Sequence, residues 1–136
     1  MPPLLRIHPA VRWLCAVVWL GVVTLTLLQS SEHPLLGPPQ PPGPVSLERE
    51  IFLDSAHILA FSAMVFLIWW GLQPARRALL VALIFCWGYG IATELLQTLV
   101  VDRGASFSDL FFDFAATGIM AYLIFRWRQR QEIASS

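Results

Sequence analysis

Charged residues are scarce in this 136-residue chain. They make up 13% of the sequence, whereas hydrophobic residues make up 57%. Soluble domains carry about 25% charged and about 45–50% apolar residues, so the composition indicates a membrane protein. The formal net charge is zero, which argues against nucleic acid as a partner. The length suits a single domain covering residues 1–136.

Lysine is absent, and all nine basic residues are arginine. This absence excludes Schiff-base lysine chemistry and the lysine of a phosphate-binding P-loop. The two cysteines, Cys15 and Cys86, lie far apart within apolar runs and lack the spacing of a metal or redox motif. We interpret both as small buried hydrophobic residues.

Long apolar runs are abundant. Four of them have the length that an α-helix needs to cross about 30 Å of hydrocarbon, namely 11–28, 54–72, 78–99 and 108–127. Arg6 and Arg12 would supply the positive region of a signal peptide at the start of the first run, but no small-residue cleavage motif follows the run, so we expect a retained helix. The sequence therefore predicts an all-α bundle of four transmembrane helices in a multi-pass membrane protein.

A stretch rich in proline and glycine, QSSEHPLLGPPQPPGP at 29–44, separates the first two runs. Proline removes backbone donors and breaks helices, so we expect a loop over 29–53. The segment VSLEREIF, which leads into the second run, is a candidate for a short interfacial helix within that loop.

Arginine is distributed unevenly between the two ends of such a bundle. Seven arginines would lie on one side, namely Arg6, Arg12, Arg76, Arg77, Arg126, Arg128 and Arg130. The other side would hold Arg49 and Arg103. The positive-inside rule then places both termini in the cytoplasm and the 29–53 loop outside. We expect the bacterial cytoplasmic membrane as the location.

Six polar residues interrupt the last three apolar runs, namely Asp54, His57, Glu94, Gln97, Asp109 and Asp113. At 1.5 Å per residue, with alternating helix directions, all of them fall within about 5–8 Å of the outer boundary. Within each run the two polar residues are three or four positions apart, so they share one helical face. We therefore expect a single polar site where the three helices meet.

Some of these residues have simpler explanations. Asp54 and Asp109 both suit the N-terminal cap of a helix. Glu94 lies near a helix C-terminus, where the helix dipole disfavours a negative charge, and Asp113 lies too deep in its helix to be a cap. Glu94 and Asp113 are therefore the strongest site candidates. His57 suits either a satisfied core position or the site.

Two further residues have open roles. Gln97 suits either the site or a hydrogen bond between helices. Arg103 is either a plain loop charge or the cation that balances the acids of the site.

In these residues the chain resembles the VanZ-like family of small membrane proteins. Asp54, His57 and Phe61 match the family's first motif, and Glu94 with Gln97 matches the second. The third motif corresponds to a set of three residues, Arg103, Asp109 and Asp113. The resemblance covers 53–123 and implies a multi-helix membrane fold with a site in these motifs.

The chain departs from the family pattern at two positions. Ser55 stands where the family usually has lysine, and Ala116 stands where glycine is common. The first departure removes a cation beside Asp54. The family's namesake is linked to resistance to the glycopeptide teicoplanin, so the resemblance implies a role in the cell envelope.

The main functional hypothesis is an enzyme or binding protein for a lipid-linked or phosphate-bearing envelope substrate. The candidate catalytic residues are Glu94, Asp113, His57 and Asp109, and the candidate binding residues are Arg103, Gln97 and Asp54. Carboxylates and histidine also suit a divalent metal, such as Mg²⁺, Mn²⁺, Ca²⁺ or Zn²⁺. Its ligands would come from His57, Glu94, Asp109 and Asp113.

Two alternatives stay open. The protein is an accessory or scaffold protein if the polar cluster only locks the helices together. It is a small ion- or proton-coupled transporter if the acids carry cations, although the inner half of the predicted bundle offers almost no polar path. Besides the lipid bilayer, a membrane-protein partner or a homo-oligomer is compatible with the sequence.

Overall fold

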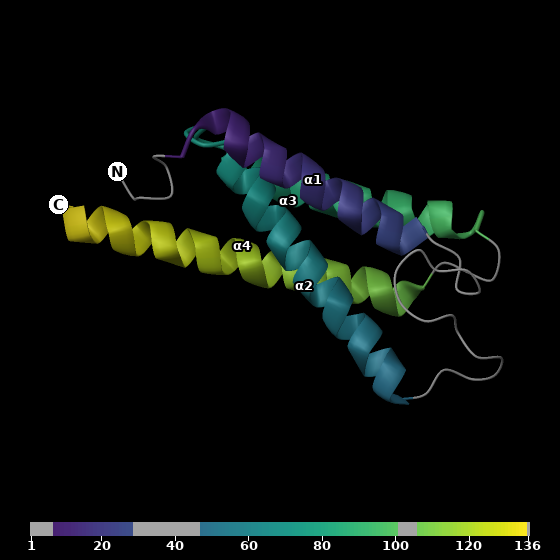
Figure 1. Ribbon diagram of the computed structural model, residues 1–136. Coiled ribbons are helices and arrows are strands. Elements are labelled where there is room, and N and C mark those ends of the chain that lie inside the picture. Colours follow the sequence, from purple (N-terminus) through teal and green to yellow (C-terminus); the bar gives the residue numbers. More distant parts are fainter. Residues whose placement is uncertain (1–6, 29–46, 101–105, 136) are drawn as a thin grey trace.

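The computed structural model describes residues 7–28, 47–100 and 106–135. They form four helices, α1 (Pro9–Leu28), α2 (Leu47–Gly71), α3 (Ala78–Gln97) and α4 (Phe107–Ser135), and no strand is present in these residues. Each helix contains a stretch that is long and apolar enough to cross a membrane. Successive helices run in opposite directions, so α1 begins and α4 ends at the same end of the bundle (Figure 1). The prediction of four helices that are long and apolar enough to span a membrane is confirmed, which supports a multi-pass membrane protein.

Two helices extend more than two residues beyond the predicted runs. Helix α2 begins at Leu47 rather than at residue 54, so the loop predicted for 29–53 extends too far at its C-terminal end. The segment LEREIF contains neither proline nor glycine, and its residues continue the helix N-terminally. Helix α4 continues past 127 to Ser135, because Arg, Gln, Glu and Ala favour helix although they are too polar to count as a membrane span.

The core lies along α2 and α3, each of which contacts the other three helices, while α1 and α4 lie on opposite sides of the bundle (Figure 1). Phe61 and Met64 of α2 are fully buried there. Small buried side chains face the same core from α3 and α4, namely Ala82, Cys86 and Ala116. Small residues let transmembrane helices approach one another closely, so the packing explains the close contact of α2, α3 and α4.

Large apolar side chains cover the outside of the bundle. Leu14, Val17, Ile84 and Ile119 each keep at least 60% of their surface exposed. Contact with lipid removes this surface from water, so the exposed apolar faces indicate a bilayer around the helices. Cys15 is also exposed on α1, and its predicted burial is therefore wrong. A thiol is apolar enough to share that lipid-facing surface.

The two ends of the bundle differ in the charges that they bury. We call the end at which α1 begins and α2 ends the arginine end. There Arg12 is only 4% exposed, and its Nη1 donates a hydrogen bond of 3.1 Å to the carbonyl oxygen of Trp70. This contact joins a cation to the C-terminus of α2, where the helix dipole is negative. We call the opposite end, which buries Glu94 and Asp113, the carboxylate end.

Candidate functional site

A contact between α2 and α4 lies at the carboxylate end. Nδ1 of His57 is 3.1 Å from Oδ1 of Asp113, close enough for a hydrogen bond and, with a protonated ring, an ion pair. Because successive helices alternate in direction, α2 and α4 run the same way, which brings a residue early in α2 to the level of a residue early in α4 (Figure 1). The carboxylate fixes the orientation of the imidazole through one ring nitrogen.

Asp113 is almost completely buried, with 1% of its surface exposed. Its Oδ2 atom has no hydrogen-bond partner among the residues that the structure describes. A buried carboxylate oxygen is stable only when it accepts hydrogen bonds or carries a proton. Oδ2 is therefore the atom of this site at which a proton or a donor group of a ligand would be received.

Helix α3 passes close to this oxygen at a glycine. A Cβ atom added at Gly90 would lie 3.6 Å from Asp113 Oδ2 and 3.4 Å from the ring of Phe61. Phe61 is completely buried, and its ring stacks on that of His57 with 8° between their planes. Phe61 and Gly90 thus pack against the His57–Asp113 pair on the side toward the middle of the bundle.

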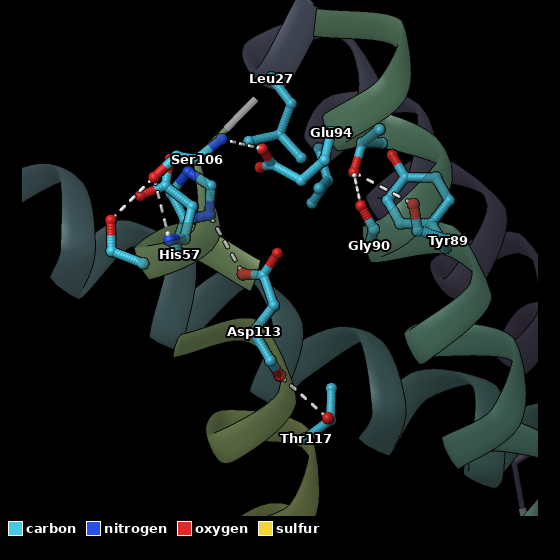
Figure 2. A network of polar contacts seen from close by, with 12 residues as sticks. Leu27, His57, Tyr89, Gly90, Glu94, Ser106, Asp113 and Thr117 are labelled. Atoms are coloured by element: carbon cyan, nitrogen blue, oxygen red, sulfur yellow. Dashed lines mark hydrogen bonds and ion pairs between the residues drawn. The ribbon is translucent and has the colours of Figure 1, made fainter. Parts of the chain in front are cut away.

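Glu94 of α3 holds the start of α4. Its Oε2 accepts a 2.6 Å hydrogen bond from the backbone N–H of Ser106, and Ser106 Oγ accepts one of 3.2 Å from the N–H of Asp109. Ser106 is thus the N-cap of α4. Figure 2 shows the side chains of His57, Glu94 and Asp113 converging from α2, α3 and α4. Glu94 itself is buried, with 5% of its surface exposed.

Gln97 joins α3 to α1. Its Nε2 donates a 3.0 Å hydrogen bond to the carbonyl oxygen of Leu27, in the last turn of α1. The last carbonyls of a helix have no partner within the helix, so this bond satisfies one of them. Gln97 is 3% exposed, and the contact supports the interpretation of Gln97 as a hydrogen-bonder between helices.

The other two acids do not cap helices. Because α2 begins at Leu47, Asp54 lies inside the helix and cannot be its N-cap, so that interpretation is wrong. Asp109 is in the first turn of α4, but the capping hydroxyl belongs to Ser106. Both carboxylates are half-buried. An acid in the first turn still interacts favourably with the helix dipole, which explains Asp109 without a direct role in the site.

The predicted metal ligands do not assemble. Among residues 7–28, 47–100 and 106–135, no group of three or more His, Cys, Asp or Glu side chains is arranged to hold a metal ion. Of the predicted set, His57 and Asp113 meet directly, while Glu94 is turned to Ser106. These residues therefore do not fit a divalent cation as they stand. The predicted binding residue Arg103 lies outside the described residues.

Sequence reasoning missed two residues that shape the structure. Ser106 stands three positions before Asp109, a spacing typical of a helix start, and that signal was available in the sequence. Arg12 was used only as one of the arginines that predict the orientation of the helices in the membrane. Its burial against Trp70 depends on where α2 ends relative to α1, and no local pattern reports that distance.

Comparison with models of known protein families gives no match, and neither the curated proteins nor the solved structures contain a match to this chain. The resemblance to the VanZ-like family stays a prediction that rests on the motif residues alone. A function must therefore be argued from the chemistry of the site.

Proposed function

We propose that this chain is a VanZ-like protein of the bacterial cytoplasmic membrane whose His57–Asp113 pair performs acid–base chemistry on a polar group of an envelope substrate. One observation carries the proposal. The buried Asp113 carboxylate holds His57 with Oδ1, while its Oδ2 has no hydrogen-bond partner among the described residues. A histidine oriented by a buried carboxylate is a recurrent arrangement for a general base.

The distribution of arginine supports the proposed orientation. Arg12, Arg76, Arg77 and Arg128 all belong to the arginine end. Under the positive-inside rule this end faces the cytoplasm, so both termini are cytoplasmic and the carboxylate end faces outward. The substrate would then reach the site from the outer leaflet.

The proposed proton transfer uses both ring nitrogens of His57. Nδ1–H donates to Asp113 Oδ1, which leaves Nε2 of the neutral ring as a proton acceptor. Nε2 takes a proton from a hydroxyl group or water, and the resulting imidazolium is stabilised by the Asp113 carboxylate. His57 later returns the same proton to the product or leaving group. The side chain of His57 is 13% exposed, so it is more accessible than Asp113.

Glu94 is assigned a positioning role in this proposal rather than that of the base. Its bond to the Ser106 N–H anchors the first turn of α4, and that helix carries Asp113. The substrate class follows from the resemblance and from the position of the site. A lipid-linked, phosphate-bearing headgroup would lie at the membrane surface beside the site, where Arg103 is proposed to meet its charge.

Resistance to teicoplanin, measured in a susceptible bacterium that expresses the chain, tests the proposal. General acid–base catalysis contributes about 10²–10⁴-fold, so His57→Gln and Asp113→Asn should each abolish the increase in inhibitory concentration that the parent chain confers. Glu132→Gln, at the arginine end, is the control and should keep the parent's effect. The amount of each variant in the membrane is measured by immunoblot.

Three results would contradict the proposal. A parent chain that confers no resistance would remove the function implied by the resemblance. A His57→Gln variant that is as abundant and as protective as the parent would remove the acid–base step. Saturable thermal stabilisation of the purified parent by Mg²⁺, Mn²⁺, Ca²⁺ or Zn²⁺, absent in Asp113→Asn, would replace it with a metal site.

A scaffold role is the second candidate, because two observations favour it. Glu94 and Gln97 both bond to backbone atoms at helix ends, the first to Ser106 and the second to Leu27. Such bonds hold helices together without chemistry. This candidate predicts that His57→Gln and Asp113→Asn keep full function whenever the protein reaches the membrane, which is the opposite of the outcome expected above.

A further inference from the structure

A second feature lies at the arginine end, far from the His57–Asp113 pair. A groove of about 570 Å³ runs between the start of α3 and the second half of α4. Its floor is apolar, with Leu79 and Leu83 from α3 and Ala121 and Phe125 from α4. An apolar floor of this kind, on the surface of a bundle that can span a membrane, suits contact with hydrocarbon.

The polarity of the groove changes along its length. Arg76 and Arg77 line it just before α3 begins, and Arg128 lines it from the facing part of α4. Along α3, Arg77 and Leu83 are about 9 Å apart at 1.5 Å per residue. The groove is therefore cationic at the end of the bundle and apolar toward the middle, which is the polarity of a phospholipid from its phosphate to its chains.

The charge balance of the groove favours an anion. Three arginines line it against a single carboxylate, that of Glu132. Arg76 and Arg77 are exposed. The first turn of α3 contains no acidic residue, and no side chain caps it, so the positive end of the helix dipole adds to the arginine charge.

We propose that this groove binds one anionic phospholipid, with the phosphate between Arg76, Arg77 and Arg128 and an acyl chain along the floor. Guanidinium groups form paired hydrogen bonds with phosphate oxygens, and basic pockets between transmembrane helices suit anionic headgroups. Leu80, which also lines the groove, and Phe125 of its floor are 55% and 50% exposed and would be covered by the acyl chain. A second copy of the protein is a poorer occupant, because it would bring arginine against arginine.

Binding of phosphatidylglycerol to the purified full-length protein in neutral detergent, measured by native mass spectrometry, tests this proposal. Phosphatidylcholine with the same acyl chains is the reference lipid. Each arginine near a membrane surface contributes about 1 kcal/mol toward anionic lipid, so Arg76→Gln/Arg77→Gln should weaken phosphatidylglycerol binding about tenfold or more.

A matched pair of arginines separates the groove from general surface charge. Arg126 and Arg130 belong to the same end of α4 but do not line the groove. Arg126→Gln/Arg130→Gln removes the same charge and should leave the binding within about twofold of the parent, as expected for exposed charges away from a site. Glu132→Gln should strengthen binding, because it removes the one carboxylate of the groove.

Several outcomes would overturn the proposal. Equal losses of phosphatidylglycerol binding in the two arginine double variants would show unspecific attraction to surface charge. Equal binding of phosphatidylglycerol and phosphatidylcholine would show that the lipid's charge has no role. Full competition by inorganic phosphate or glycerol phosphate would indicate a site for a soluble anion. A dimer that forms with protein concentration and excludes lipid would assign the groove to a second copy. If Arg76→Gln/Arg77→Gln elutes from size exclusion differently from the parent, Arg128→Gln takes its place. The same weakening of phosphatidylglycerol binding is expected for Arg128→Gln.

Discussion

The two ends of the bundle bury charge in different ways. At the carboxylate end, Glu94 and Asp113 are enclosed and bond to groups on other elements, Ser106 and His57. At the arginine end, Arg12 is enclosed against the Trp70 carbonyl, while Arg76 and Arg77 stay exposed. The first end uses several side chains to organise three helices, and the second uses one.

The chemistry of the side chains accounts for the difference. A carboxyl group has a short stem, so a carboxylate within a helix bundle must find its donors inside the protein. Arginine has a long stem and reaches the membrane surface from a position deeper in the helix. Buried carboxylates therefore need hydrogen-bond donors placed within the bundle, whereas the exposed arginines at the other end, Arg76 and Arg77, are solvated at the surface. This contrast makes the carboxylate end the more vulnerable to substitution.

The largest expected effect comes from removing the Glu94 carboxylate. Glu94→Leu should lower the free energy of unfolding by about 3 kcal/mol, since a hydrogen bond to a charged group is lost and the Ser106 N–H is left unpaired. Glu94→Gln keeps an acceptor and should lose less than half as much. Steric-trapping measurements of unfolding in micelles provide the comparison, and a Glu94→Leu variant as stable as the parent would remove the anchoring role.

A smaller effect is expected where α3 approaches Asp113. Gly90→Leu should destabilise the protein by about 2 kcal/mol through overpacking against Phe61 and Asp113. Gly88 of the same helix has no atom within 4 Å of an added Cβ, so Gly88→Leu is the matched control and should be tolerated. The unfolding midpoint in detergent separates the two variants. Equal midpoints would mean that α3 and α4 do not pack closely at Gly90.

The smallest effect is expected at the arginine end. Arg12→Met keeps the apolar stem but loses the bond to the Trp70 carbonyl, and a hydrogen bond in a membrane protein contributes about 0.6–1.7 kcal/mol. The exposed Arg130 provides a control, because Arg130→Met should change the unfolding free energy by less than about 0.5 kcal/mol. Both values come from the same unfolding assay in lipid-free detergent. If Arg12→Met cost more than Glu94→Leu, the contrast between the two ends would be reversed.

The membrane helices were predictable because length and apolarity decide whether a segment spans a bilayer. The helix ends were not, since the hydropathy test reports where polarity changes and not where the backbone leaves the helix. Leu47 begins α2 in a polar segment, and Ser135 ends α4 in another. Only local helix preference, which is weak, marks these extensions.

The meeting of His57 with Asp113 follows from alternating helix directions and shared faces, both of which the sequence contains. The individual bonds do not follow in that way. Glu94 turns to the backbone of Ser106, and Gln97 turns to the backbone of Leu27, because backbone groups at helix ends lack partners. Motif residues identify which side chains gather, whereas the free donors and acceptors around them decide what each one binds.

The length of α2 has a consequence for the depth of the site. A helix of 25 residues is about 37 Å long at 1.5 Å per residue, more than the roughly 30 Å of bilayer hydrocarbon. Figure 1 shows α2 crossing the other helices obliquely, and its first turns expose Leu47, Ile51 and Phe52. Tilt and bilayer thickness together then set how much of this helix leaves the hydrocarbon. The distance from His57 to the lipid headgroups thus depends on the surrounding membrane as well as on the protein.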